Sequence, residues 1–149
     1  MPPAAPPVET RLTILPAWID YNGHMNVAYY VLAFDKATDT LYDTLGIGGG
    51  YVAQRQRSLF TLAMNVDYLR EVFAGDEVLI TSRMLDHDRK RVHYFHEMRH
   101  AGEGWLAATN ECVAVHVDMT LRRSAPFDDE AAARLAAMKD AHAARRSTG

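Results

Sequence analysis

A short polar segment, residues 20–26 with the sequence DYNGHMN, holds the densest group of side chains that could do chemistry. Asp20 is its one acid, and Asn26 stands where the N-cap of a following helix is expected. At a helix start, unpaired backbone N–H groups and the helix dipole favour negative charge, and they can stabilise a carbonyl oxygen that becomes an oxyanion. Asp20 could then attack the carbonyl carbon or activate a water molecule, so the segment predicts a site for acyl transfer.

The polar residues of this segment also have structural interpretations. Asp20 could simply cap a turn. His24 could orient a substrate, but the pattern favours a backbone hydrogen bond that shapes the turn. Asn26 is more often a helix cap than a ligand.

The elements on either side must position this segment. Residues 10–15 alternate in polarity and end at Pro16, which predicts a short strand. From residue 27 to residue 45 apolar side chains recur at helical spacing, and Gly46 is well placed to end that helix. One long amphipathic helix is therefore expected, with an apolar stripe formed by Val27, Tyr30, Val31, Phe34, Ala37, Leu41 and Leu45.

Beyond a flexible break at residues 48–50, the chain reads as strands and one more helix. The strands are expected at residues 59–69, 77–85, 91–99 and 105–117, and the C-terminal helix at 128–144. Four consecutive strands with short turns predict an antiparallel meander, against which the long helix buries its stripe, so the fold class is α+β. Residues 1–8 are expected to be a flexible arm and residues 9–149 a single domain. The edge strands favour self-association as a homodimer or homotetramer.

Composition excludes several classes of protein. A net charge of −3 over 149 residues argues against a general nucleic-acid binder. No apolar stretch is long enough to cross a bilayer, and no signal peptide is evident, so a cytoplasmic location is expected. Cys112 lies in an apolar run and is interpreted as a packed core thiol. Cysteine and histidine do not occur at zinc-site spacing, so no metal site is predicted at His87, His93, His96, His100 or His116.

The segment DYNGHMN followed by VAYY resembles the 4-hydroxybenzoyl-CoA thioesterase family of hot-dog enzymes. Two later passages are similar to that family: YLRE with GDEV, from residue 68 to residue 78, and residues 105–123. The resemblance covers roughly residues 10–127. It implies an antiparallel sheet wrapped around one long central helix, together with subunits that place their active sites at an interface.

The resemblance also implies roles for individual residues. Asp20 would be the nucleophile or general base of a thioester hydrolase, and the helix amides near Val27 would polarise the thioester carbonyl. CoA would be a part of the substrate, so no cofactor is expected. Its phosphates would be held by basic residues, which could equally be solvated turns: Arg89, Lys90, Arg91, Arg122 and Arg123.

Aromatic residues suggest the nature of the acyl group. Trp18, Tyr21, Tyr29, Tyr30 and Phe60 could line an acyl pocket, and ring faces hold quaternary ammonium groups, although at least half of these rings are expected to be packing. The segment WIDYNGHMN also resembles the thioesterases of carnitine and betaine catabolism that act on betainyl-CoA. A short or aromatic acyl-CoA is an open alternative.

Two other functions are compatible with the same fold. A hot-dog hydratase or dehydratase would pair Asp20 with His24, but its usual motif has one more residue between acid and base and a proline that this chain lacks. A non-catalytic acyl-CoA-binding module would not need the intact Asp20.

Overall fold

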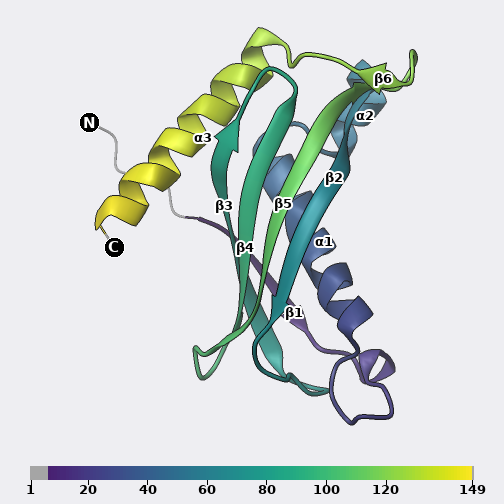
Figure 1. Ribbon diagram of the computed structural model, residues 1–149, viewed down its shortest axis with the longest axis vertical. Helices are drawn as coiled ribbons and strands as arrows, with labels where there is room; N and C mark the ends of the chain where they lie inside the picture. Colours follow the sequence, from purple (N-terminus) through teal and green to yellow (C-terminus); the bar gives the residue numbers. More distant parts are fainter. Residues whose placement is uncertain (1–6, 149) are drawn as a thin grey trace.

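The computed structural model describes residues 7–148, and the side chains of residues 7–143. Residues 1–6 of the predicted N-terminal arm lie outside this range, whereas Val8 already belongs to the first strand. The strands form one antiparallel sheet that curves around helix α1 (Val27–Thr44), as Figure 1 shows. This confirms the predicted α+β architecture of a sheet around one central helix. The strand order is β1 (Val8–Thr13), β3 (Glu77–His87), β4 (Arg91–His100), β5 (Leu106–Asp118) and β2 (Arg57–Tyr68), with β6 (Arg123–Ser124) beside β5.

The predicted four-strand meander is only partly right. Strands β3, β4 and β5 are consecutive neighbours, but β2 pairs with β5 instead of β3, and β1 takes the place beside β3. Helix α1 carries the chain across the concave face, so β2 begins at the edge opposite β1 (Figure 1). The connection from β2 to β3, residues 69–76, is too long for a tight hairpin, and it leads the chain from the β2 edge to β3 at the other side of the sheet.

Helix α1 begins and ends at the residues that its sequence predicts. The Asn26 side chain accepts a hydrogen bond from the Ala28 N–H, which caps the first turn. At the other end Gly46 has a φ of +74°, and the Ile47 N–H donates to the Tyr42 carbonyl, which is a Schellman ending. The side chains between these caps that face the sheet are buried: Tyr30, Ala33, Phe34, Ala37, Thr38, Leu41 and Tyr42.

Short elements near the ends of α1 were not predicted. The expected break at residues 48–50 opens helix α2 (Gly49–Arg55), which is held because Tyr51 is buried against His116. A 3-10 turn, η1 (Pro16–Trp18), lies between β1 and the polar segment.

Helix α3 (Asp129–Thr148) covers the part of β3 that β1 leaves unpaired, where the Met84 N–H donates to the His142 ring.

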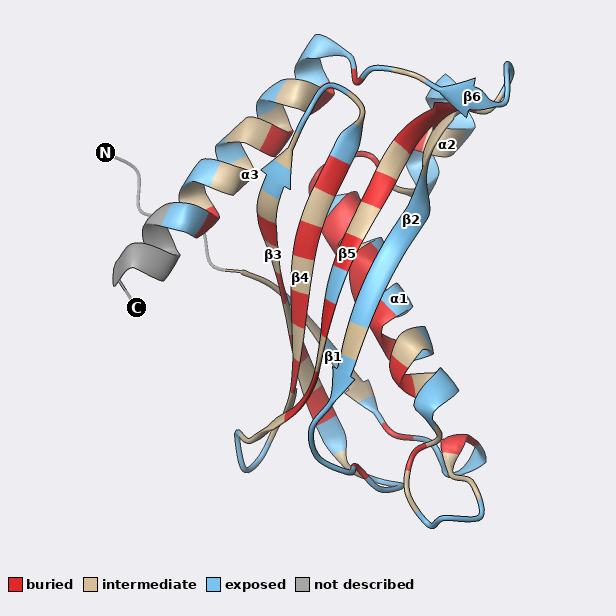
Figure 2. Ribbon diagram, viewed as in Figure 1, coloured by how far each residue is buried: buried red, intermediate tan, exposed pale blue. Residues whose placement is uncertain are grey.

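Strand β2 differs from the rest of the sheet in its exposure. In Figure 2 most of β2 is exposed, whereas β3, β4 and β5 alternate between buried and partly exposed residues. The exposed side chains of β2 include the large apolar residues Phe60, Leu62, Met64 and Tyr68. No helix in the part of the chain that the structure describes is both long enough and apolar enough to cross a membrane.

Candidate active site

The polar segment forms a tight loop at the N-terminal end of α1. An isolated bridge joins Ile19 to Met25, and the Gly23 N–H donates to the Asp20 carbonyl at 3.0 Å. Gly23 has a φ of +86°, a conformation that side chains with a Cβ rarely adopt. The Met25 N–H donates to the Val72 carbonyl at 2.9 Å, so the β2–β3 connection anchors the loop.

Both oxygens of the Asp20 carboxylate accept a hydrogen bond. The Asn22 N–H donates to Oδ1 at 2.8 Å, and the Asn26 side-chain amide donates to Oδ2 at 2.8 Å. These two donors, the backbone one first, lower the pKa of Asp20 below its ordinary value. The carboxylate is therefore ionised at neutral pH and held in a fixed orientation, as a nucleophile or general base requires.

An open backbone amide lies next to this carboxylate. At the start of α1, the Ala28 N–H donates to Asn26 Oδ1 and the Tyr29 N–H donates to the Asn26 carbonyl. Among residues 7–148, nothing in the protein accepts from the Val27 N–H. The Tyr68 hydroxyl donates to the Val27 carbonyl at 3.2 Å and so helps to fix that residue. The site thus combines an ionised acid with a free N–H at a helix start, where an oxyanion would be stabilised.

His24 serves the loop: the Asp20 N–H donates to the His24 carbonyl at 3.3 Å, while the His24 ring has other partners than the Asp20 carboxylate. Its Nδ1 lies 3.0 Å from the Met25 carbonyl, to which the ring donates, and its Nε2 lies 3.7 Å from Glu71. Both nitrogens thus face protein partners. This geometry matches the structural interpretation of His24.

The aromatic residues of the predicted pocket comprise packed rings, one exposed ring beside Asp20 and one ring far from it. Trp18 stacks on Tyr29 with ring centroids 5.7 Å apart, and Trp18 is buried, so this pair packs beneath the loop. Tyr30 is buried in the core. Tyr21 is 97% exposed beside Asp20, and its ring is therefore open to a ligand. Phe60 lies on β2 eight residues before Tyr68, about 26 Å along the strand from this site.

The two predicted basic clusters lie together, but away from Asp20. Arg89 and Lys90 lie in the turn before β4 and Arg91 begins β4, while Arg122 follows β5 and Arg123 begins β6. The Lys90 ammonium donates to Ser124 at 3.3 Å, which brings the two turns side by side. In Figure 1 this end of the sheet is opposite the loop that carries Asp20. The 18 residues of α1 span the interval, about 27 Å.

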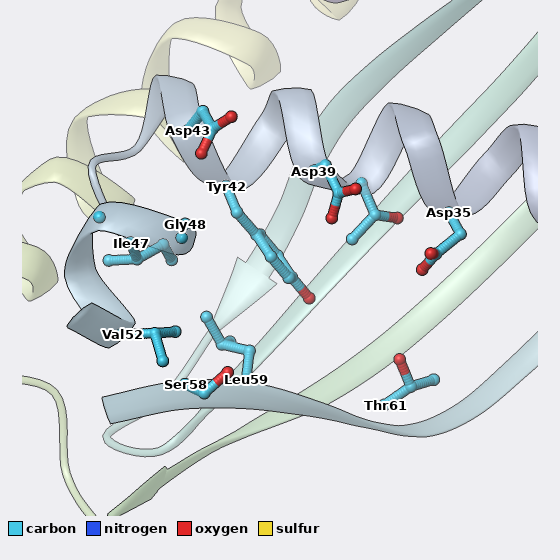
Figure 3. A pocket seen from close by; sticks show the side chains of 13 residues that line it. Asp35, Asp39, Tyr42, Asp43, Ile47, Gly48, Val52, Ser58, Leu59 and Thr61 are labelled. Carbon is cyan, nitrogen blue, oxygen red and sulfur yellow. The ribbon is translucent and has the colours of Figure 1, made fainter. Parts of the chain in front are cut away.

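A cavity of about 660 Å³ lies farther along α1, between this helix, α2 and β2 (Figure 3). Asp35, Asp39 and Asp43 line its helix side. Burial, and then repulsion from the other two carboxylates, raises the pKa of Asp39. The cavity begins more than two turns beyond Asp20, so it is separate from the Asp20 site within one chain.

Two tyrosine hydroxyls hold the site through hydrogen bonds that the sequence did not indicate. Tyr68 fixes the Val27 carbonyl, and the Tyr30 hydroxyl accepts from the Val72 N–H and donates to the Arg70 carbonyl. Residues 68–71, with the sequence YLRE that carries part of the family resemblance, form the segment that packs against the start of α1.

Cys112 and the histidines are the other groups whose side chains could react or bind a metal. Cys112 is buried, as expected, and burial raises the pKa of its thiol to about 11, so it is no thiolate at neutral pH. Across residues 7–148 no three His, Cys, Asp or Glu side chains gather as a metal site would require.

Comparison with known sequences places this geometry among thioesterases. The profile of the thioesterase-like superfamily matches residues 14–135. A betainyl-CoA thioesterase of Pseudomonas aeruginosa is 40% identical over 131 residues, which cover 88% of this chain and 82% of that protein. An L-carnitine dehydrogenase/betainyl-CoA thioesterase of Rhizobium meliloti is 33% identical over 91% of this chain, which spans 27% of that longer protein.

Solved structures share the fold over most of the chain. A Staphylococcus aureus protein solved in complex with CoA superposes with a TM-score of 0.86 at 27% identity, covering 91% of this chain and 85% of that one. A putative thioesterase of Pseudomonas putida KT2440 superposes with a TM-score of 0.79 at 36% identity, covering 91% of this chain and 87% of that one.

Proposed function

The chain belongs to the thioesterase-like superfamily and is an acyl-CoA thioesterase, and from that premise we propose that it hydrolyses betainyl-CoA with Asp20 as the catalytic carboxylate. The observation that carries the proposal is the pairing of an ionised, doubly hydrogen-bonded Asp20 with the open Val27 N–H. The 40% identity to a betainyl-CoA thioesterase supports the choice of acyl group.

The thioester carbonyl would lie between Asp20 and the start of α1. Its oxygen would accept from the Val27 N–H, so that the negative charge formed in the tetrahedral intermediate meets a fixed donor and the positive end of the helix dipole. Asp20 would add to the carbonyl carbon, or take a proton from the water that adds. In the first route the C–S bond breaks, CoA leaves as thiolate, and water then hydrolyses the Asp20 anhydride, which frees betaine, restores the carboxylate and supplies a proton to the thiolate. In the second route the C–S bond breaks in the water adduct, and the thiolate takes the proton that Asp20 had accepted, so betaine, CoA thiol and the carboxylate result.

The exposed ring of Tyr21 is the group best placed to contact the trimethylammonium of a betainyl chain. A ring face attracts a quaternary ammonium by its quadrupole. Tyr21 directly follows Asp20, and its almost complete exposure leaves both faces open. Trp18 and Tyr29 support this corner of the site from below through their stacked rings.

A hydratase would need a histidine that works with the acid. His24 instead holds the Met25 carbonyl and faces Glu71. Because the His24 ring is engaged with these two groups, the arrangement favours hydrolysis over a reaction that needs an acid–histidine pair.

A second copy of the chain would complete the site through β2. The free edge of β2 carries exposed Phe60, Leu62 and Met64, and an edge strand with apolar side chains favours pairing. A two-fold, antiparallel pairing centred on the middle of β2 would set the Arg57 end of one copy beside Tyr68 of the other. The basic turns of one copy, with Arg89, Lys90, Arg91, Arg122 and Arg123, would then approach the Asp20 loop of its partner and could hold CoA phosphates.

Thiol release from a panel of CoA esters tests the proposed function. The panel contains betainyl, short-chain, long-chain and benzoyl esters, and free thiol is followed with a colorimetric reagent. We expect the highest kcat/KM with betainyl-CoA. Preference for a neutral ester would reject the betainyl assignment, and absence of thiol release from every ester would reject the hydrolytic role.

A further inference from the structure

A second, smaller pocket lies where α2 meets β2. It has a volume of about 200 Å³ and is lined by Tyr51, Arg55, Arg57, His116, Pro126 and Asp128. Gln56, between the two arginines, has a left-handed backbone with a φ of +57°, so the chain turns sharply there. The turn directs both guanidinium groups toward one small space at the end of the sheet.

Each of the two arginines is held by an ion pair that occupies only part of its guanidinium group. Arg55 Nη1 lies 3.6 Å from Asp128, and Arg57 Nη1 lies 3.3 Å from Asp118 and also donates to the Arg55 carbonyl. In the described part of the chain, neither guanidinium engages a protein acceptor through Nε or Nη2. Those N–H groups form the fork with which arginine binds phosphate in a bidentate manner.

The two carboxylates nearby already have structural roles. Asp118 Oδ1 accepts from the Thr120 and Leu121 N–H groups, and Asp128 Oδ1 accepts from the Ala131 N–H at the start of α3. Each acid therefore offers its arginine a single oxygen. With Lys90, Arg122 and Arg123 on the neighbouring turns, this end of the sheet keeps positive charge available for an anion.

The remaining lining groups shape the pocket without adding charge. His116 Nδ1 donates to the Ala125 carbonyl at 2.8 Å, so Nε2 accepts from the Tyr51 hydroxyl at 2.7 Å. Burial lowers the pKa of His116, which leaves the ring neutral at neutral pH. Tyr51 and His116 thus form a neutral part of the wall, Asp128 is the one acid in the lining, and the two arginines supply the recognition of an anion.

We propose that Arg55 and Arg57 form a binding site for a phosphate group of the CoA nucleotide. The inference rests on the proposed function, because it takes CoA as the source of the phosphate. The pocket is large enough for one phosphate group with its water, but is small for a nucleotide base and ribose. Antiparallel pairing of β2 would place Arg57 close to Tyr68 of a second copy, and hence within reach of CoA held at that copy's Asp20.

Calorimetric titration of the full chain with CoA, dephospho-CoA and pantetheine tests the site. We expect Arg57→Gln and Arg55→Gln each to weaken CoA binding about tenfold, since each removes one charged hydrogen-bonding fork. Pantetheine, which carries no phosphate, should bind both variants as it binds the wild type, and this also shows that they are folded. Arg57→Lys keeps the charge without the fork, so its affinity for CoA should lie between those of the wild type and Arg57→Gln.

The three ligands separate the two kinds of phosphate in CoA. If the variants lose affinity for CoA alone, the 3′-phosphate occupies the pocket; if they also lose affinity for dephospho-CoA, the pyrophosphate does. Arg11→Gln is the matched control, because Arg11 is an exposed, ion-paired arginine on the opposite edge strand, β1, and its loss should leave CoA binding unchanged.

Two results would overturn the proposal: unchanged CoA affinity in both glutamine variants, or equal affinity of the wild type for CoA and pantetheine. Thiol release distinguishes this failure from failure of the proposed function. An enzyme that cleaves CoA esters equally well without Arg55 and Arg57 retains its function and loses only this site.

Discussion

The side-chain amide of Asn26 links the start of helix α1 to Asp20. Its Oδ1 accepts from the Ala28 N–H at 2.9 Å, and its Nδ2 donates to Asp20 Oδ2 at 2.8 Å. The residue that caps the start of the helix therefore also orients the acid, and Val27, with its open N–H, comes directly after it. A shift of the helix start would move the acid and the oxyanion donor together, so their separation is preserved.

Two substitutions at Asn26 should separate these tasks. Asn26→Ser keeps a capping oxygen but is too short to reach Asp20, so stability should change by less than about 0.5 kcal/mol while kcat/KM falls about tenfold. Asn26→Ala also loses the cap and should cost about 1 kcal/mol of unfolding free energy. Urea unfolding and steady-state kinetics measure the two effects.

The pH dependence of the Asn26→Ser variant gives a further test of the link. The Asn26 amide helps to lower the pKa of Asp20, so its loss should raise that pKa. Because Asp20 must be ionised to act in the proposed mechanism, the acid limb of kcat/KM should move to higher pH. An unshifted acid limb would mean that Asn26 does not position a catalytic Asp20.

Asp20→Asn should reduce kcat by about a thousandfold, because the amide is neither a nucleophile nor a base. The carboxylate lies in a surface loop, and asparagine still accepts from the Asn22 N–H, so the melting temperature should change little. Asp140→Asn, on the exposed face of α3, is a matched control and should keep full activity. Thiol release at a wild-type rate from the Asp20→Asn variant would place the catalytic group elsewhere.

The proposed self-association through β2 predicts the effect of one charge on that strand. Leu62 is 57% exposed on β2, and Leu62→Lys should convert the oligomer to a monomer and abolish turnover if the site needs both copies. Leu121 is 58% exposed in the loop after β5, so Leu121→Lys is a control of equal exposure. Analytical ultracentrifugation measures the mass of both variants. A Leu62→Lys variant that keeps the wild-type mass would exclude β2 as the interface.

Local features of the fold could be predicted from the sequence. Asn26 and Gly46 mark the ends of α1 because a cap and a left-handed residue act within one turn of the helix. The loop at Asp20 was found for the same reason, since its turn, acid and cap lie within seven residues.

Pairings between distant residues could not be predicted in this way. The pattern of β2 indicates a strand, but it does not state that Met64 faces Cys112 on β5. The bond from Tyr68 to Val27 joins residues 41 positions apart, so neither residue carries a local signal for it. The sequence identifies the basic residues of the turns as candidates for binding phosphate. Their position at the far end of α1 depends on the strand order, which the sequence pattern does not reveal.

Acid stability should depend on His96, which is buried between α1 and the sheet. Its Nε2 lies 2.9 Å from the Thr38 hydroxyl and its Nδ1 lies 2.6 Å from the Ser82 hydroxyl, and burial lowers its pKa from 6.5 to about 4. The unfolded chain therefore binds a proton between pH 6.5 and pH 4 that the folded protein excludes, so the free energy of unfolding should fall as pH decreases through that window. The fall due to this residue is about 3 kcal/mol by pH 4. His96→Gln removes the titration at some cost in packing. Between pH 6.5 and pH 4 the unfolding free energy of this variant should therefore fall by about 3 kcal/mol less than that of the wild type. Urea unfolding at pH 7, 5.5 and 4 measures the difference, and identical pH dependence in both proteins would show that His96 does not control it.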